Sequence, residues 1–238
     1  QNRGAEGGAI YLQAASPTIQ SCVFDSNIAV NRGGAIHAKD YCYPVIERCR
    51  FTACQAQNID GGAVFADGGG PKITGCIFEK CSAQSRGGAV RLWGSDTVLT
   101  NNTIFGNTAA DGGAVAIQGA APRIYNNLIA RNSSGLFASG GALPELYNNN
   151  LWDNAGQDYQ GLSPGVGDIG LDPLLGAPTY GDFHLRDSSP CINAGANAAP
   201  YLPSLDLDGQ GRKNGVVDIG ADEYWPGRTY YVATTGSD

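Results

Sequence analysis

Four side chains recur at equivalent positions along the chain and could form a face that binds sugars. They are Tyr11, His37, Phe65 and Arg91, and each lies four residues after the first glycine of a Gly-Gly pair. Aromatic rings stack on sugar rings, and His and Arg supply polar contacts. The row contains no carboxylate, although a glycoside hydrolase needs two or three acids close together. We therefore expect a carbohydrate-binding face here, with a polysaccharide as partner, and we assign no catalytic residue.

A second group of candidate ligands lies near the C-terminal end, where acidic residues alternate as in a calcium loop. Asp206 and Asp208 match the first half of such a loop, in which alternating side chains converge on one ion. Val217 replaces the glutamate expected at the twelfth position, but Asp218 or Asp222 could substitute for it. We expect Ca²⁺ as a candidate cofactor of Asp206, Asp208 and Asp218, and the alternative is a turn braced by carboxylates.

The elements that must position these residues repeat every 22 to 27 residues. Gly-Gly-Ala followed by a branched apolar residue opens five segments, and two columns of Cys or Asn advance in step with it. The first column comprises Cys22, Cys49, Cys76, Asn102, Asn127 and Asn149, and the second comprises Asn27, Cys54, Cys81, Asn107, Asn132 and Asn154. Periods of this length are typical of repeat proteins.

Each repeat carries the signals of strands, because inward and outward positions alternate after the glycines and turn residues follow. The repeats predict an all-β, right-handed parallel β-helix of about six coils. In such a stack equivalent residues lie above one another, so the Asn columns would form hydrogen-bonded ladders and the thiols would pack in the core. Disulfides between Cys49 and Cys76 or between Cys54 and Cys81 stay open as an alternative.

Composition narrows the classes of partner. The chain has 238 residues, a net charge of −7 and a pI near 4.7. Nucleic-acid binding requires clustered Lys and Arg, and none cluster here, so we expect no nucleic-acid partner. No run of eighteen apolar residues occurs, and we expect no membrane span.

Beyond Asn154 the repeats stop, and several motifs follow in a set order. They include SPCINAG at 189–195, DLDG at 206–209 and VDIGADEY at 217–224. This segment resembles the closing segment of bacterial choice-of-anchor Q domain proteins, but it has Asn193 where that family usually has Asp and Asp222 where it usually has an aromatic residue. The resemblance implies a right-handed parallel β-helix that is exported and anchored at the cell surface.

The repeats themselves resemble those of polymorphic outer membrane proteins, which combine Gly-Gly-Ala-Ile with Phe-x-x-Asn. Residues 7–10 and 24–27 contain both halves, and the resemblance extends over residues 4–132. It implies adhesion or surface display. We therefore expect an extracellular or cell-surface structural or adhesive module, and the alternative is a polysaccharide lyase or glycoside hydrolase acting on an acidic polysaccharide, because many parallel β-helices are such enzymes.

The last residues carry a strand pattern that would suit the beginning of a β-helix. Tyr230, Tyr231 and Val232 open a stretch that resembles the first strand of this kind of protein. Either the chain is cut from a tandem array, or the strand completes the exposed first coil of a second copy and gives head-to-tail filaments. We thus expect repeats at 1–154, a capping segment at 155–225 and an assembly tail at 226–238.

Overall fold

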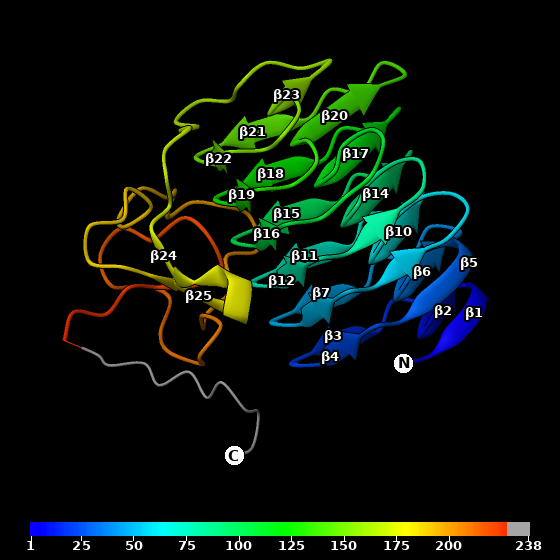
Figure 1. The fold of residues 1–238 in the computed structure, drawn as a ribbon, viewed down its shortest axis with the longest axis horizontal. Helices are drawn as coiled ribbons and strands as arrows, with labels where there is room; N and C mark the ends of the chain where they lie inside the picture. The colour runs from blue at the N-terminus through cyan, green and yellow to red at the C-terminus, as the bar shows by residue number, and fades with distance from the viewer. Residues whose placement is uncertain (228–238) are drawn as a thin grey trace.

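The computed structural model describes residues 1–227 and shows stacked coils with an irregular segment beside them (Figure 1). Four sheets run along the stack, and every pairing within them is parallel and joins consecutive coils. This arrangement confirms the all-β parallel β-helix predicted from the repeats. In the described part of the chain, no helix has the length and apolar character that a bilayer crossing requires.

The four sheets are numbered by the order in which the chain enters them within a coil. Sheet 1 contains β1 (Arg3–Glu6), β5 (Ile28–Arg32), β9 (Gln55–Ala56) and β13 (Ser82–Ala83). Sheet 2 contains β2 (Ile10–Gln13), β6 (Ile36–Lys39), β10 (Val64–Asp67), β14 (Val90–Trp93), β17 (Val115–Gln118), β20 (Leu136–Ser139) and β23 (Tyr159–Gln160). Sheet 3 contains β3 (Thr18–Gln20), β7 (Val45–Glu47), β11 (Lys72–Thr74), β15 (Val98–Thr100), β18 (Arg123–Tyr125) and β21 (Glu145–Tyr147). Sheet 4 contains β4 (Val23–Asp25), β8 (Arg50–Thr52), β12 (Ile77–Glu79), β16 (Thr103–Phe105), β19 (Leu128–Ala130) and β22 (Asn150–Trp152).

The two glycines of each Gly-Gly pair meet different requirements. Gly87, the first of its pair, has a φ of 68°, which a residue with a side chain adopts only at a cost. Gly88, the second, faces the next coil so closely that a Cβ atom on it would lie 2.2 Å from the carbonyl oxygen of Gly113. The motif therefore recurs because the turn needs a left-handed residue followed by a residue without a side chain.

The asparagine columns are stacked inside the turns. The amide of Asn102 donates to Asn127 Oδ1 at 2.9 Å, and the amide of Asn127 donates to Asn149 Oδ1 at 3.1 Å. Asn127 Oδ1 also accepts the main-chain N–H of Asn102, and the Asn102 amide donates to the main-chain oxygen of Ile73. The ladder thus pairs main-chain groups of the turns that would otherwise be buried without partners.

Cysteine takes the place of asparagine in the earlier coils. Cys76 Sγ accepts the main-chain N–H of Cys49 at 3.4 Å and donates to the carbonyl oxygen of Ile46 at 3.5 Å. All seven cysteines are free thiols, so neither of the disulfides considered above is formed. Cys22 is exposed, whereas the other six are buried in the structure.

Parallel pairing continues past the expected boundary at residue 154. Strand β23 joins sheet 2 beside β20, and Ile169 forms a further parallel bridge with Asn150. The coil therefore continues, with shorter and less regular pairing, for some fifteen residues beyond Asn154 before the chain leaves the stack.

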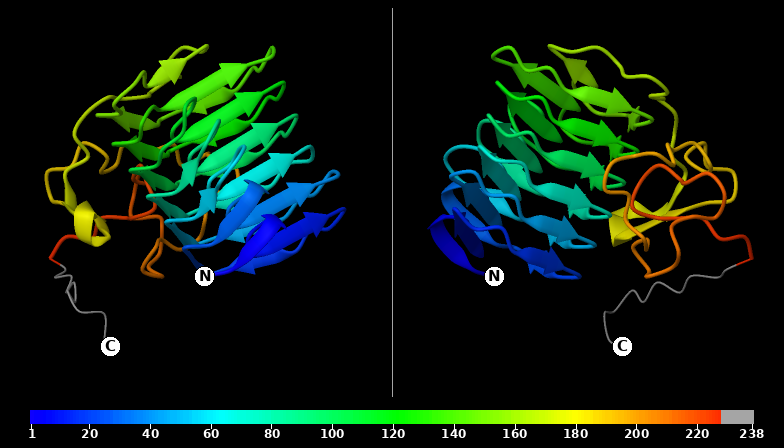
Figure 2. Two further views of the ribbon diagram at one scale, coloured as in Figure 1. Left: turned by 45° about the vertical axis from the view of Figure 1, so that its right-hand side comes forward. Right: turned by 180° about the vertical axis from the view of Figure 1, so that it is seen from behind.

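The segment after the stack lies along the flank of the solenoid (Figure 2). It contains β24 (Leu175–Ala177), the 3-10 turn η1 (Pro178–Tyr180) and β25 (Asp182–Leu185), with β24 and β25 antiparallel. Its main chain meets sheet 4 where the N–H of Ala221 donates to Thr103 Oγ1 at 3.0 Å. Phe183 and Ile219 pack with outward residues of sheet 4 such as Leu128 to form a second apolar core. The segment expected to cap the coils thus covers their side.

Candidate functional site

The predicted sugar-binding row on sheet 2 is in register but largely covered. Tyr11 pairs with His37 and His37 with Phe65, and their ring centroids are 5.3 and 4.9 Å apart in edge-to-face contact. Tyr11 is 44% exposed, whereas the other three residues of the row are at most 2% exposed. The row therefore packs as a ladder of its own on the outside of sheet 2.

The covering groups come from residues that immediately precede the Gly-Gly pairs. The guanidinium carbon of Arg32 lies 5.4 Å from the centroid of the Phe65 ring, and Asp60 Oδ2 accepts a hydrogen bond from Arg91 Nε at 3.1 Å. Alternation along a strand predicts the direction of a side chain but not what folds over it. Within the predicted row, Tyr11 has a side chain that a ligand could reach, whereas His37, Phe65 and Arg91 are buried.

The candidate calcium ligands are not gathered at one point. Asp206 Oδ1 accepts the main-chain N–H groups of Asp208 at 3.0 Å and Gln210 at 2.7 Å, which makes it the brace of a turn. Asp218 accepts the main-chain N–H groups of Asn193 and Tyr224, both at 2.6 Å. The structure thus uses these two carboxylates to hold the main chain, as the alternative interpretation expected.

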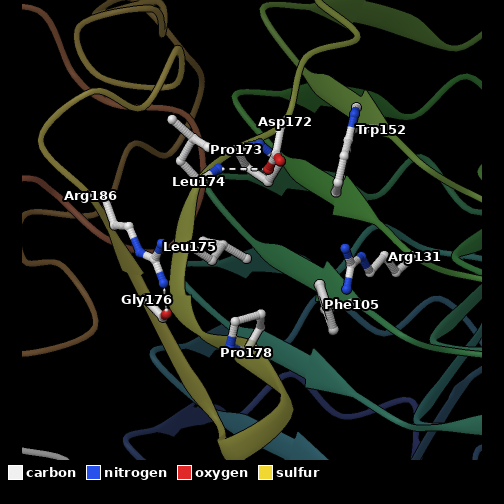
Figure 3. A pocket seen from close by; sticks show the side chains of 10 residues that line it. All are labelled: Phe105, Arg131, Trp152, Asp172, Pro173, Leu174, Leu175, Gly176, Pro178 and Arg186. Atoms are coloured by element: carbon white, nitrogen blue, oxygen red, sulfur yellow. Dashed lines mark hydrogen bonds between the residues drawn. The ribbon is translucent and has the colours of Figure 1, made fainter.

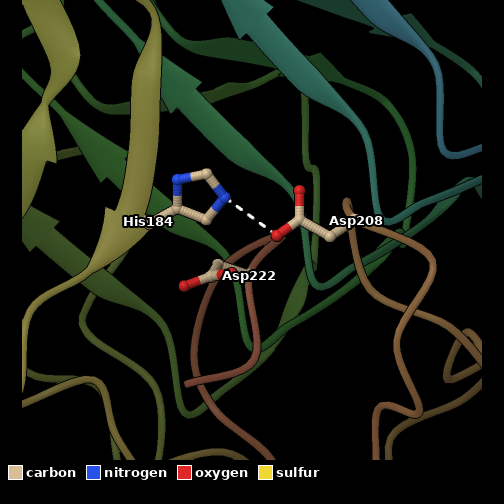
Figure 4. Close-up of side chains that lie close together, drawn as sticks. All are labelled: His184, Asp208 and Asp222. Carbon is tan, nitrogen blue, oxygen red and sulfur yellow. Dashed lines mark hydrogen bonds and ion pairs between the residues drawn. The ribbon is translucent and has the colours of Figure 1, made fainter. Parts of the chain in front are cut away.

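Asp208 instead joins Asp222, which the sequence offered as a substitute ligand of the calcium loop, and His184, which sequence reasoning did not group with them (Figure 4). His184 Nε2 lies 2.9 Å from Asp208 Oδ2, and its Nδ1 lies 2.5 Å from Asp182 Oδ1. Burial lowers the pKa of His184, but the hydrogen bonds to Asp208 and Asp182 and the charge of Asp222 outweigh it and raise the pKa to about 9. Burial raises the pKa of Asp222 to about 7. We call these four residues the His184 cluster.

A cleft of about 190 Å³ separates sheet 4 from the flanking segment (Figure 3). One wall comes from the outer face of sheet 4 and the other from the chain that leads into β24 and returns after β25. The lining residues are Phe105, Arg131, Trp152, Asp172, Pro173, Leu174, Leu175, Gly176, Pro178 and Arg186. We call this space the flank cleft.

Two cations, Arg131 and Arg186, and two aromatic rings, Phe105 and Trp152, give the flank cleft its chemistry. The guanidinium of Arg131 lies over the Trp152 ring at 5.3 Å and its Nε lies 3.3 Å from Asp153 Oδ2. Arg186 donates to the carbonyl oxygen of Gly176 across the hairpin. Asp172 Oδ1 accepts the main-chain N–H of Leu174 at 3.0 Å, so this carboxylate holds a turn.

The lining of the flank cleft contains fewer carboxylates than the hydrolysis of a glycoside uses. Its lining includes one carboxylate, and that carboxylate is occupied by a turn, whereas acid–base cleavage of a glycoside needs two. Arginines and an indole favour a planar or ring-shaped ligand that carries a carboxylate.

Sequence reasoning missed this cleft because its walls are distant in the chain. Trp152 ends the last strand of sheet 4, whereas Arg186 follows β25 in the irregular segment. A usable signal was present, since Phe105 and Trp152 are large aromatic residues at outward positions of the same sheet. Outward aromatics indicate that something packs there, but the repeat pattern does not say what.

Comparison with known protein families found one match over most of the solenoid. The family model described as a right handed beta helix region matches residues 2–151, which is more than half of the chain. Neither the curated proteins nor the solved structures contained a match to the chain. The matched residues extend from β1 into β22, so they span the parallel coils of sheets 1 to 4 apart from β23. The chain therefore belongs to the right-handed β-helix family.

Proposed function

We propose that this chain is an exported structural or adhesive module of a cell surface that binds an acidic polysaccharide in its flank cleft without cleaving it. The observation that carries this proposal is the placement of Trp152 beneath Arg131, in a cleft that Arg186 also lines. The location at the cell surface is supported by the resemblances of the repeats and of the closing segment to surface proteins.

The lining favours a sugar acid over a neutral sugar. An aromatic face packs against the C–H groups of a pyranose ring, and a guanidinium accepts a carboxylate in a two-point contact. At about 190 Å³ the cleft is smaller than the 300–1,000 Å³ of typical pockets for whole small molecules. It would therefore hold about one residue of a polymer that continues along the flank.

The solenoid provides a rigid support for such contacts. Trp152 ends β22, and Arg131 follows β19, which pairs with β16 and β22 on its two sides. The main chain at Arg131 is thus held by a strand that is paired on both sides, and β22, the edge strand that carries Trp152, is bridged on its other side at Ile169. A main chain that is already held in place loses little further freedom when a ligand binds, and that lowers the cost of association.

The proposal is tested by the binding of polygalacturonate and alginate, with a neutral glucan as the reference polymer, in calorimetry and affinity electrophoresis. We expect binding of at least one acidic polymer, weaker at high salt, and a loss of about tenfold in affinity on Trp152→Ala, which corresponds to about 1.4 kcal/mol. Arg131→Gln should weaken binding while leaving the packing of the ring largely intact. Trp93→Ala is the matched control, because Trp93 is a half-exposed indole on sheet 2, away from the cleft.

Unchanged affinity in Trp152→Ala and Arg131→Gln, or no binding of either acidic polymer, would overturn the assignment of the flank cleft. The same mixtures decide between binding and the enzymatic alternative. Accumulation of unsaturated uronate would indicate a lyase, and new reducing ends without unsaturation would indicate a hydrolase. If the unaltered chain forms either product and an equally stable Trp152→Ala variant does not, the flank cleft is catalytic and the binding proposal is wrong.

A further inference from the structure

The His184 cluster brings together nitrogen and oxygen donors from three separate segments of the flank. His184 comes from β25, Asp208 from the turn braced by Asp206, and Asp222 from the chain that crosses sheet 4. One ligand atom from each of His184, Asp208 and Asp222 lies within 4.8 Å of the others. Figure 4 shows the two carboxylates on adjoining sides of the imidazole.

Two buried carboxylate oxygens in this region have no hydrogen-bond donor among the described residues. Asp222 is 2% exposed, and while its Oδ2 accepts the main-chain N–H of Leu185 at 2.7 Å, its Oδ1 has no partner. Asp206 is fully buried, and its Oδ2 is also without a partner. A buried carboxylate oxygen without a donor is costly, and a bound cation is one of the few groups that can compensate it.

The nearest buried guanidinium has other partners. Arg212 donates to the main-chain oxygens of Asp222 and Gly220, at 2.5 and 2.7 Å, and lies 3.6 Å from Glu223 Oε2. Its contacts thus tie the closing loop together and do not reach Asp222 Oδ1. The negative charge around the imidazole therefore exceeds what the local cations offset.

Asp182 gives the imidazole the support that metal-binding histidines usually have. It lies 2.5 Å from Nδ1 and is itself held by the main-chain N–H of His184 at 3.1 Å. When Nδ1–H donates to a carboxylate, the lone pair of Nε2 is directed to a metal, and this pairing also raises the basicity of the ligand. In the structure Nε2 points toward Asp208, on the side where the carboxylates converge.

We propose that His184 Nε2, Asp208 and Asp222 bind one divalent transition-metal ion of the zinc class, with Asp182 as the positioning residue. Imidazole together with two carboxylates suits Zn²⁺, whereas Ca²⁺ and Mg²⁺ prefer oxygen ligands alone. Ligand atoms around tetrahedral Zn²⁺ are about 3.3 Å apart. His184 Nε2 and Asp208 Oδ2, at 2.9 Å, would move apart slightly, and ligand atoms that are as much as 4.8 Å apart would approach one another by about 1.5 Å. Asp208 is exposed, which leaves a fourth position open to water. Because the ligand is the neutral imidazole, the ion competes with a proton for Nε2.

This inference is independent of the proposed polysaccharide binding, because the cluster and the flank cleft share no residue. The test uses the full chain, stripped with a chelator and titrated with ZnCl₂, and in parallel with CaCl₂ and MgCl₂, by calorimetry and elemental analysis. We expect one Zn²⁺ per chain, no comparable binding of Ca²⁺ or Mg²⁺, and a Tm increase of roughly 5 to 10 °C at a hundredfold excess of Zn²⁺ over Kd.

Substitutions distinguish Zn²⁺ binding at the His184 cluster from nonspecific Zn²⁺ binding elsewhere on the chain. Asp222→Asn and Asp208→Asn keep the shape of the side chain and an accepting oxygen, and each should weaken Zn²⁺ binding by at least tenfold. Asp187→Asn, which removes an exposed acid a few residues from His184, should bind Zn²⁺ as the unaltered chain does. Co²⁺ loading should give the strong visible absorption of a four-coordinate ion, and this absorption should disappear in Asp208→Asn.

Two outcomes would overturn the site. One is the absence of stoichiometric Zn²⁺ binding by the folded, stripped chain. The other is equal Zn²⁺ affinity in the unaltered chain, Asp208→Asn and Asp222→Asn, which would show that the ion binds elsewhere. If Asp222→Asn fails to fold, Asp208→Asn decides the question, because Asp208 lies at the exposed edge of the cluster.

Discussion

Stacking gives His37 an environment that its position on a strand does not suggest. Its ring is held edge to face between Tyr11 and Phe65, and its side chain is 3% exposed. Burial, together with the charges of Arg32 and Lys39, lowers its pKa to about 4.

One acid opposes this shift without reversing it, and a second acid lies close to the ring. Asp40 raises the pKa of His37, but burial and the two cations outweigh it. Glu6 Oε2 lies 3.1 Å from Nδ1 but without hydrogen-bond alignment, and Glu6 is also contacted by Arg32 at 3.8 Å. His37 is therefore a neutral member of a packed ladder.

His37→Phe should remove part of the acid sensitivity of the fold. The folded-state pKa of His37 lies near 4, below the usual 6.5, so the unfolded chain takes up the proton more readily. The stability that depends on neutral His37 is fully present above pH 6.5 and is lost as pH falls toward 4, by about 3 kcal/mol at most. Denaturant unfolding of both proteins from pH 7.5 to 4 checks this, and parallel stability curves would contradict it.

At the scale of the element, the Gly-Gly turn sets how closely one coil approaches the next. The second glycine of each of the first four pairs faces a carbonyl oxygen of the neighbouring coil at a distance that excludes any side chain, and Gly113 of the fifth pair faces Ser133 and Ser134 as closely. The turn therefore controls both the path of the chain within a coil and the spacing between coils. The Asn and Cys ladders lie in other turns of the coil and depend on that spacing.

Gly88→Ala should destabilise the fold far more than Gly94→Ala. A Cβ on Gly88 would lie 2.2 Å from Gly113 O, so two coils would have to separate, and we expect a loss of about 3 kcal/mol or more. Gly94 has a φ of 56° but nothing within 4 Å of its Cβ position, so alanine there should cost about 1 to 2 kcal/mol. Urea unfolding of both variants measures the difference, and similar midpoints would mean that coil spacing is not set at this turn.

At the scale of the whole molecule, the coils form an unbranched stack with an irregular segment along one flank. Each strand of the first coil has a parallel neighbour on one side only among the described residues. The strand proposed to complete such an edge in a second copy includes Tyr230, Tyr231 and Val232, which lie outside the described residues. Head-to-tail assembly of this module therefore stays a prediction.

Deletion of residues 227–238 should prevent filament formation if the tail adds to the first coil of a second copy. Strand addition supplies main-chain hydrogen bonds to an open edge, and repeated addition does not close on itself. Electron microscopy and sedimentation of the complete and truncated chains measure the effect. A synthetic peptide of residues 229–238 should shorten the filaments, whereas a peptide of the same composition in scrambled order should not. Equal polymers from both chains would exclude the tail from assembly.

The repeating glycine, asparagine and cysteine positions by themselves predict the parallel β-helix. Gly-Gly pairs and columns of Asn or Cys recur at steps of 22 to 27 residues. If each step is one coil of a parallel β-helix, equivalent residues are stacked, and stacked residues are what the hydrogen-bonded ladders require. The coil class, the alternation of inward and outward residues and the ladders follow from that periodicity.

Tertiary structure alone decided which outward residues meet solvent and which distant residues meet one another. His37 points outward from its strand yet is covered by neighbouring side chains, and Arg131 meets Arg186 across a cleft that no repeat specifies. His184 and Asp208 come together because the flanking segment follows a path determined by its packing on sheet 4. A periodic pattern encodes contacts between equivalent residues of successive coils, whereas an irregular segment takes its course from the particular surface that it covers.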